Sequence, residues 1–215
     1  MKIVIVEDHT LISDFLKGIC KTRLGIGDVN VTENGTAGIA AILAAHPDLV
    51  LLDLHLPDID GFSVVSSIRS IGVFPLIVVL SGFCNAYTVW RSEETRIDGF
   101  IDKNTSSGDD ICEAISAAGS NSKFFSDSYR SIQRALKADP FSHPKVLSRL
   151  QHTVLQMIGS ALSDSEIAER IGRSRFAAEK HRFRILGRLG LKTMPELIRY
   201  ARENGFDSLG PPPAR

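Results

Sequence analysis

The sequence predicts an α/β domain built on a doubly wound parallel sheet, followed by a small all-α domain. In the first half of the chain, short apolar runs alternate with stretches whose apolar residues recur every three or four positions. The runs are typical of buried strands and the stretches of amphipathic helices. In the second half only the helical period is present.

The distribution of charge also divides the chain. Residues 1–121 carry 8 Lys and Arg against 16 Asp and Glu, whereas residues 122–215 carry 17 against 9. The zero net charge of the chain therefore conceals an acidic half of −8 and a basic half of +8. This asymmetry favours two domains, the second attracted to a polyanion, although solvated surface charge would also account for it.

The bulk composition limits the classes of protein. Hydrophobic residues make up 43% of the chain, which is enough for packed cores. The longest apolar runs, such as residues 76–80, are too short to span a bilayer, and the first residues lack the features of a signal peptide. The three cysteines form no C-x-x-C pair. We therefore expect a cytoplasmic protein with no membrane partner, disulfide framework or zinc site.

Five apolar runs predict the strands of the first domain. The segments between them have helical spacing, as in Leu11, Phe15 and Ile19. Strands that alternate with helices form a parallel sheet covered on both faces. The domain is expected over residues 1–120. The five predicted strands are 2–6, 29–32, 49–53, 75–81 and 99–102.

The pattern weakens after the first domain. Residues 121–144 include a short helical stretch at 127–137, but two X-Pro pairs interrupt the chain, so we interpret this interval as a linker. A helical domain is expected over 145–206. The proline-rich end, 207–215, is expected to be a disordered tail.

Polar residues stand at the ends of four predicted strands. Because the carboxyl ends of parallel strands meet at one edge of a sheet, these side chains should converge. Clustered carboxylates and hard oxygen ligands suit Mg²⁺, and a carboxylate can also attack phosphorus to form an aspartyl phosphate. Each residue alone is typical of a surface loop, but their joint placement favours a site. They are Glu7, Asp8, Asp53, Ser81 and Lys103.

These motifs resemble the receiver domain of bacterial two-component response regulators, which has a flavodoxin-like sheet. The motifs are VEDH at 6–9, LLDLHLPDIDG at 51–61, LSG at 80–82 and GFIDK at 99–103. The resemblance implies that Asp53 accepts a phosphoryl group from a histidine kinase. It also implies that Ser81 and Lys103 contact that group, and that Phe100 is the switch aromatic.

The same resemblance implies a Mg²⁺ site formed by Glu7, Asp8, Asp53 and the backbone carbonyl of His55. The protein would then be no enzyme beyond phosphotransfer to Asp53 and hydrolysis from it. A phosphatase with Asp53 as nucleophile is disfavoured, because the sequence lacks an evident second acid for turnover.

A basic segment in the second half predicts DNA binding. Ser163 and Glu166 form a capping box that opens one helix, and a strongly basic helix follows a turn at Gly172. Two helices joined in this way indicate a helix-turn-helix unit, with Phe176 expected on its buried face. A membrane or an acidic protein is the alternative partner. The candidate DNA contacts are Arg173, Ser174, Arg175, Glu179, Lys180, Arg182, Arg184, Arg188 and Lys192.

The second half also resembles the LuxR-type output domain of NarL/FixJ regulators, through residues 154–174, His181 and 184–201. The resemblance implies a transcription regulator that binds double-stranded DNA as a homodimer when active. Glu179 stands where the family has a lysine that meets DNA. An acid there repels phosphate or accepts from a cytosine amino group. The alternative is an interaction protein whose helical domain binds a protein and has little affinity for DNA.

Overall fold

The computed structural model describes residues 1–120 and 122–210. The chain divides into two compact units. Met1–Cys84 and Arg91–Arg130 make up the first, while Asn85–Trp90 and the chain from Ser131 onward make up the second. Within the described residues, no helix combines the length and the apolar character that crossing a membrane would require.

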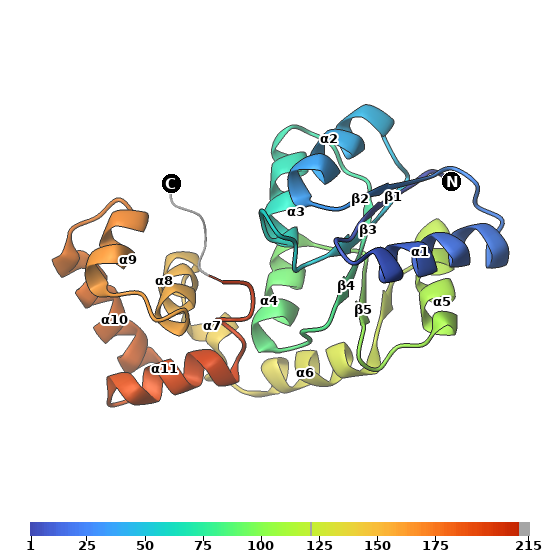
Figure 1. Ribbon diagram of the computed structural model, residues 1–215. Coiled ribbons are helices and arrows are strands. Elements are labelled where there is room, and N and C mark those ends of the chain that lie inside the picture. Colours follow the sequence, from blue (N-terminus) through green and yellow to red (C-terminus); the bar gives the residue numbers. More distant parts are fainter. Residues whose placement is uncertain (121, 211–215) are drawn as a thin grey trace. The chain divides into compact units, whose positions relative to one another are not determined.

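The first unit is built on a parallel sheet of six strands in the order β2-β1-β3-β4-β5-β6 (Figure 1). The apolar residues of the inner strands β1 and β3 have no exposed surface, because helices cover both faces of the sheet. The prediction of a doubly wound parallel sheet followed by a helical region is confirmed. The strands are β1 (Ile3–Val6), β2 (Val29–Thr32), β3 (Leu49–Asp53), β4 (Leu76–Ser81), β5 (Gly99–Asp102) and β6 (Phe124–Phe125).

The sequence predicted five strands, whereas the sheet contains six. The additional strand, β6, pairs in parallel with β5, with Phe124 opposite Gly99 and Phe125 opposite Phe100. A Cβ atom on Gly99 would lie 2.9 Å from the Phe124 carbonyl oxygen, so the close approach of β6 depends on glycine at that position. A two-residue strand is too short to give an alternating pattern, which is why the sequence does not reveal it.

Helices cover both faces of the sheet in the first unit. Helices α1 and α5 lie on one face and α2 and α3 on the other (Figure 1). Asn34 caps α2, and Asp60 caps α3 by accepting from the Ser63 amide. The helices are α1 (Thr10–Gly18) with its π-helical extension η1 (Ile19–Arg23), α2 (Gly35–Ala45), α3 (Gly61–Ser70) and α5 (Gly108–Gly119). Helix α4 (Ala86–Thr95) is divided, because its residues up to Trp90 belong to the second unit.

The interval expected as a linker contains regular structure in its described part. Besides β6 it holds α6 (Asp127–Ala138) and a single turn, α7 (His143–Val146). The hydroxyl of Ser142 donates to the Leu136 carbonyl at 2.8 Å and so fixes the break between the two helices. The X-Pro pairs therefore mark the ends of helices rather than a stretch without structure.

The second unit packs four longer helices around an apolar core. Side chains cap each of them, and the capping box predicted for Ser163 and Glu166 is confirmed. Val154, Ile185 and Leu197 are fully buried between the helices. The helices are α8 (Arg149–Gly159), α9 (Asp164–Arg170), α10 (Arg175–Arg188) and α11 (Met194–Glu203).

Part of the expected disordered tail is ordered. Residues 207–209 form turns, and the Gln156 side-chain amide donates to the Gly210 carbonyl at 2.8 Å. Leu209 packs on the core of the second unit, which explains why the chain stays ordered past residue 206. Residues 211–215 of the predicted tail lie outside the described residues.

Two buried histidines lie in contact in the second unit. His143 is fully buried and His152 is 2% exposed, and His143 Nδ1 lies 3.0 Å from His152 Nε2. Burial, together with the neighbouring His152, lowers the pKa of His143 to about 3. A histidine in the unfolded chain has a pKa of about 6.5, so acid favours unfolding of this unit.

We predict that the unfolding free energy falls between pH 6.5 and about 3, because only the unfolded chain protonates His143 in that range. The slope due to this residue approaches about 1.4 kcal/mol per pH unit. Denaturant unfolding followed by the fluorescence of Trp90, which is the single tryptophan and belongs to the second unit, measures it. His143→Gln should flatten the slope and His46→Asn should not. Equal slopes in wild type and His143→Gln would contradict the assignment.

Candidate functional site

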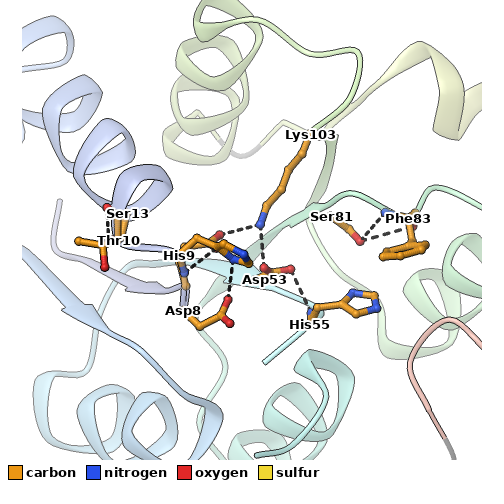
Figure 2. Close-up of polar contacts among 10 residues, drawn as sticks. Asp8, His9, Thr10, Ser13, Asp53, His55, Ser81, Phe83 and Lys103 are labelled. Carbon is orange, nitrogen blue, oxygen red and sulfur yellow. Dashed lines mark hydrogen bonds and ion pairs between the residues drawn. The ribbon is translucent and has the colours of Figure 1, made fainter. Parts of the chain in front are cut away.

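Asp53 ends β3 as a buried carboxylate with two donors. Its side chain is 4% exposed. Oδ2 accepts from the Lys103 ammonium at 2.7 Å, and Oδ1 accepts from the His55 backbone amide at 3.0 Å (Figure 2). These contacts compensate for the cost of burying a charge at the end of an otherwise apolar strand.

Lys103 joins Asp53 to a second buried acid. Its ammonium also donates to Glu7 Oε2 at 2.7 Å, and Glu7 follows β1 directly and is 1% exposed. Burial raises the pKa of Glu7, and the hydrogen bond from Lys103 opposes that rise. The Lys103 backbone amide donates to the Ser81 carbonyl at 2.9 Å. The ends of β1, β3, β4 and β5 are therefore held together at one edge of the sheet.

Asp8 and His9 complete an acidic cluster beside Asp53. His9 Nδ1 lies 2.9 Å from Asp8 Oδ1 and 3.3 Å from Glu7 Oε1. Glu7, Asp8, His9 and Asp53 each offer one ligand atom, and these atoms lie within 4.8 Å of one another. The carboxylates are the hard oxygen donors that Mg²⁺ prefers, so the donor set fits that ion. Sequence reasoning missed His9, whose position next to two acids was the available signal.

Ser81, His55 and Phe83 lie near Asp53 at the same edge (Figure 2). The Ser81 hydroxyl oxygen accepts from the Phe83 backbone amide at 3.1 Å, and Ser81 is fully buried. The His55 ring stacks on the Phe83 ring with centroids 4.4 Å apart. The loops after β3 and β4 are thus held against each other by an aromatic contact beside the carboxylate.

Phe100 lies within the core of the first unit. It is fully buried in β5, and its ring centroid is 5.1 Å from that of Tyr129, which is also buried. The Phe100 ring therefore lies inside the core rather than on the surface.

The loop after β3 requires glycine at its far end. A Cβ atom on Gly61 would lie 2.4 Å from the Asp53 carbonyl oxygen and 3.0 Å from Leu54 Cα. The Gly61 amide donates to the Leu54 carbonyl at 3.1 Å, so the loop closes back on the strand. This close approach fixes the backbone from which the Asp53 side chain projects.

The candidate DNA contacts occupy different environments in the second unit. Some are engaged within it. Arg182 donates to Asp164 at 2.5 Å and lies 3.8 Å from Glu179, while Arg188 donates to the Gln151 side-chain oxygen at 2.7 Å. Ser174 caps α10. The exposed basic residues among them are Arg173, Arg175, Lys180, Arg184, Arg188 and Lys192.

The expectation that Phe176 lies on the buried face of α10 is wrong. Phe176 is 74% exposed, and Phe183 on the same helix is 61% exposed. Ala178, Ile185 and Leu186 form the buried face instead. The heptad spacing between the two phenylalanines was visible in the sequence, but apolar character alone did not tell which face meets the core.

Residues 3–116 match the family described as "Response regulator receiver domain". The chain belongs to this family. The response regulator is 28% identical over 203 residues to the Fimbriae Z protein of Salmonella typhimurium, covering 94% of this chain and 96% of that protein. It is 27% identical over 213 residues to the transcriptional regulatory protein MctR of Rhizobium johnstonii, covering 97% of this chain and 96% of that protein.

The fold of this response regulator is similar to that of RcsB from Salmonella enterica serovar Typhimurium, solved bound to promoter rprA in the presence of the phosphomimetic BeF3-. The TM-score is 0.66 at 22% identity, over 94% of this chain and 98% of that chain. The similarity covers both the sheet unit and the helical unit, and the predicted resemblance to NarL/FixJ-type response regulators is confirmed.

We predict that Gly61→Ala destabilises the response regulator by about 1–3 kcal/mol, because the added methyl group forces the loop away from Asp53. Gly18→Ala is the matched control, since a Cβ atom there meets nothing within 4 Å and the residue is helical. Denaturant unfolding of both variants measures the difference. Equal stability of the two variants would show that the loop does not need glycine.

Proposed function

We propose that this response regulator is a phosphorylation-controlled DNA-binding transcription regulator, and that Asp53 accepts the phosphoryl group from a histidine kinase. The observation that carries the proposal is the partly buried Lys103 ammonium, which lies 2.7 Å from both Asp53 and Glu7. A carboxylate, a second acid and a cation thus lie together at one edge of the sheet, which supports a nucleophilic role for Asp53. Phosphoryl transfer needs this combination of positioning and charge.

In the proposed reaction, an Asp53 carboxylate oxygen attacks the phosphorus of the kinase phosphohistidine. The new P–O bond forms as the P–N bond breaks, and the imidazole nitrogen keeps the electron pair of that bond. Glu7, Asp8, Asp53 and the backbone carbonyl of His55 are the groups that would hold Mg²⁺. The chemistry that this ion supplies when bound is neutralisation of the phosphoryl oxygens.

Lys103 and Ser81 then respond to the larger anion. An acyl phosphate carries more charge and more acceptor oxygens than a carboxylate. The Lys103 ammonium, shared between two acids, is expected to shift toward the phosphoryl group. The Ser81 hydroxyl can donate to it. A change in the packing of the buried Phe100 ring against Tyr129 would follow this rearrangement as the switch that reports phosphorylation.

The helical unit would bind double-stranded DNA through α9 and α10. The turn between them includes Gly172 in the left-handed region at φ +63°, and exposed Arg173, Arg175, Lys180 and Arg184 follow it. Such residues release counterions from phosphates and supply affinity. We expect the active form to be a homodimer on half-sites about 34 Å apart.

A protein-binding role for the helical unit is the second candidate. It is favoured by Glu179, an acid on α10 whose oxygen lies 3.8 Å from an Arg182 nitrogen. Arg182 is also bound to Asp164, so its charge is largely satisfied within the unit. Salt-dependent DNA binding would count against this candidate.

Beryllofluoride with Mg²⁺ should raise the affinity of wild type for its DNA site by about tenfold or more, which is a typical coupling between two sites. Asp53→Asn should abolish the gain, because the amide cannot hold the phosphoryl analogue. Asp14→Asn, at an exposed position on α1, is the matched control. Selective DNA binding that is unchanged by beryllofluoride and by Asp53→Asn would contradict control by phosphorylation.

Glu179→Lys should strengthen binding to DNA, because an acid that repels phosphate is replaced by a cation that contacts it. The slope of the logarithm of the binding constant against the logarithm of the salt concentration should steepen by about one. The same substitution at Glu203, exposed near the end of α11, should change both much less. Titrations between 50 and 200 mM salt, a range over which such contacts are screened, measure the slopes. Equal effects at the two positions would place Glu179 away from DNA.

A further inference from the structure

Two phenylalanines are exposed on one face of α10. Phe176 is 74% exposed and Phe183 is 61% exposed, which is unusual for rings of this size. They are seven residues apart, so they lie two turns along the same side of the helix, with Lys180 between them. Neither ring contributes to the core of the second unit.

Positive charge surrounds this aromatic stripe. Arg173, Arg175, Lys180 and Arg184 are all exposed, and the Arg182 guanidinium lies 5.7 Å from the centre of the Phe183 ring. A partner that fits must therefore present anionic groups around recessed apolar ones. Double-stranded DNA does so, because thymine methyl groups lie in the major groove between two rows of phosphates.

We propose that Phe176 and Phe183 read thymine methyl groups in the major groove and make the response regulator selective for T-containing half-sites. The proposal rests on the DNA binding proposed above. Seven helical residues span about 10 Å, and base pairs are stacked about 3.4 Å apart. The two rings therefore reach thymines about three base pairs apart.

This assignment separates two kinds of contact on α10. The arginines and lysines bind phosphates and carry little sequence information. The phenylalanines have no hydrogen-bonding groups on their side chains, so they distinguish thymine from cytosine only by the C5 methyl group. Uracil presents the same hydrogen-bonding groups as thymine and lacks only that methyl group. Replacing thymine by deoxyuridine therefore removes the methyl group and leaves the hydrogen-bonding groups of the base unchanged.

The test begins with selection from random double-stranded DNA by the full chain in the presence of Mg²⁺ and beryllofluoride. Affinities are then measured for the selected site and for copies in which single thymines are replaced by deoxyuridine. Wild type should bind about three- to fivefold more weakly when a contacted thymine loses its methyl group, as expected for one apolar carbon. Phe176→Ala and Phe183→Ala should each lose the discrimination at one thymine and keep it at the other.

Phe74→Ala is the matched control. Phe74 is 72% exposed and belongs to the first unit. The Phe74→Ala variant therefore loses a ring of similar exposure, and it should still discriminate thymine from deoxyuridine at both positions. Thermal unfolding of each variant checks that exposed rings are removed without loss of the fold.

Two results would overturn the proposal while leaving DNA binding intact. One is a selected site without thymine at the required spacing. The other is that replacing thymine by deoxyuridine lowers the DNA affinity of wild type and of the phenylalanine variants equally, or changes neither. If no sequence is enriched in any state, even at low salt, both this proposal and the DNA-binding function fail. The aromatic stripe would then fit an acidic protein surface.

Discussion

The two contacts of the Lys103 ammonium hold together the edge of the sheet at which Asp53 lies. The ammonium lies 2.7 Å from Asp53 and 2.7 Å from Glu7, two acids that are almost completely buried. Two buried carboxylates on neighbouring strands would repel each other, and one would be driven to its neutral form. A shared cation allows both to remain close, and it also ties the end of β5 to the ends of β1 and β3.

In the proposed function, the same sharing would make the site responsive to phosphorylation. An ammonium divided between two anions is redistributed when either of them gains charge, whereas an ammonium held by one acid is not. The backbone around it is less able to move, since Gly61 lies against the Asp53 carbonyl and the His55 ring stacks on Phe83. In the proposed function, such a frame would confine the response to a change of charge at Asp53 to a displacement of the Lys103 side chain.

In the second unit, the residues proposed to contact DNA are ones that the core leaves exposed. The buried face of α10 is small and aliphatic, so its two phenylalanines and most of its basic residues face solvent. Pairing within the unit reduces the number of basic side chains that can meet a partner, as the contact between Arg182 and Asp164 shows. Counting charge along the sequence therefore overstates the positive surface of this helix.

Much of the fold was predictable, because the period of apolar residues reflects burial directly. Five of the six strands and the capped helices follow from it. The strand formed by Phe124 and Phe125 did not, because two residues give no period and its pairing depends on the distant Gly99. The interval 121–144 was interpreted as a linker because two X-Pro pairs interrupt it, although the helical stretch expected at 127–137 is present as α6.

By itself the sequence determined which residues stand at strand ends, and thus that Glu7, Asp53, Ser81 and Lys103 share one edge. That result needs only the rule that parallel strands end on the same side. Only the tertiary structure decided that His9 joins the acidic cluster and that Phe176 faces solvent. The sequence shows His9 beside two acids, but its closeness to Asp53 depends on the pairing of distant strands. The exposure of Phe176 depends on which face of α10 packs against other helices, and local periodicity carries no information about such contacts.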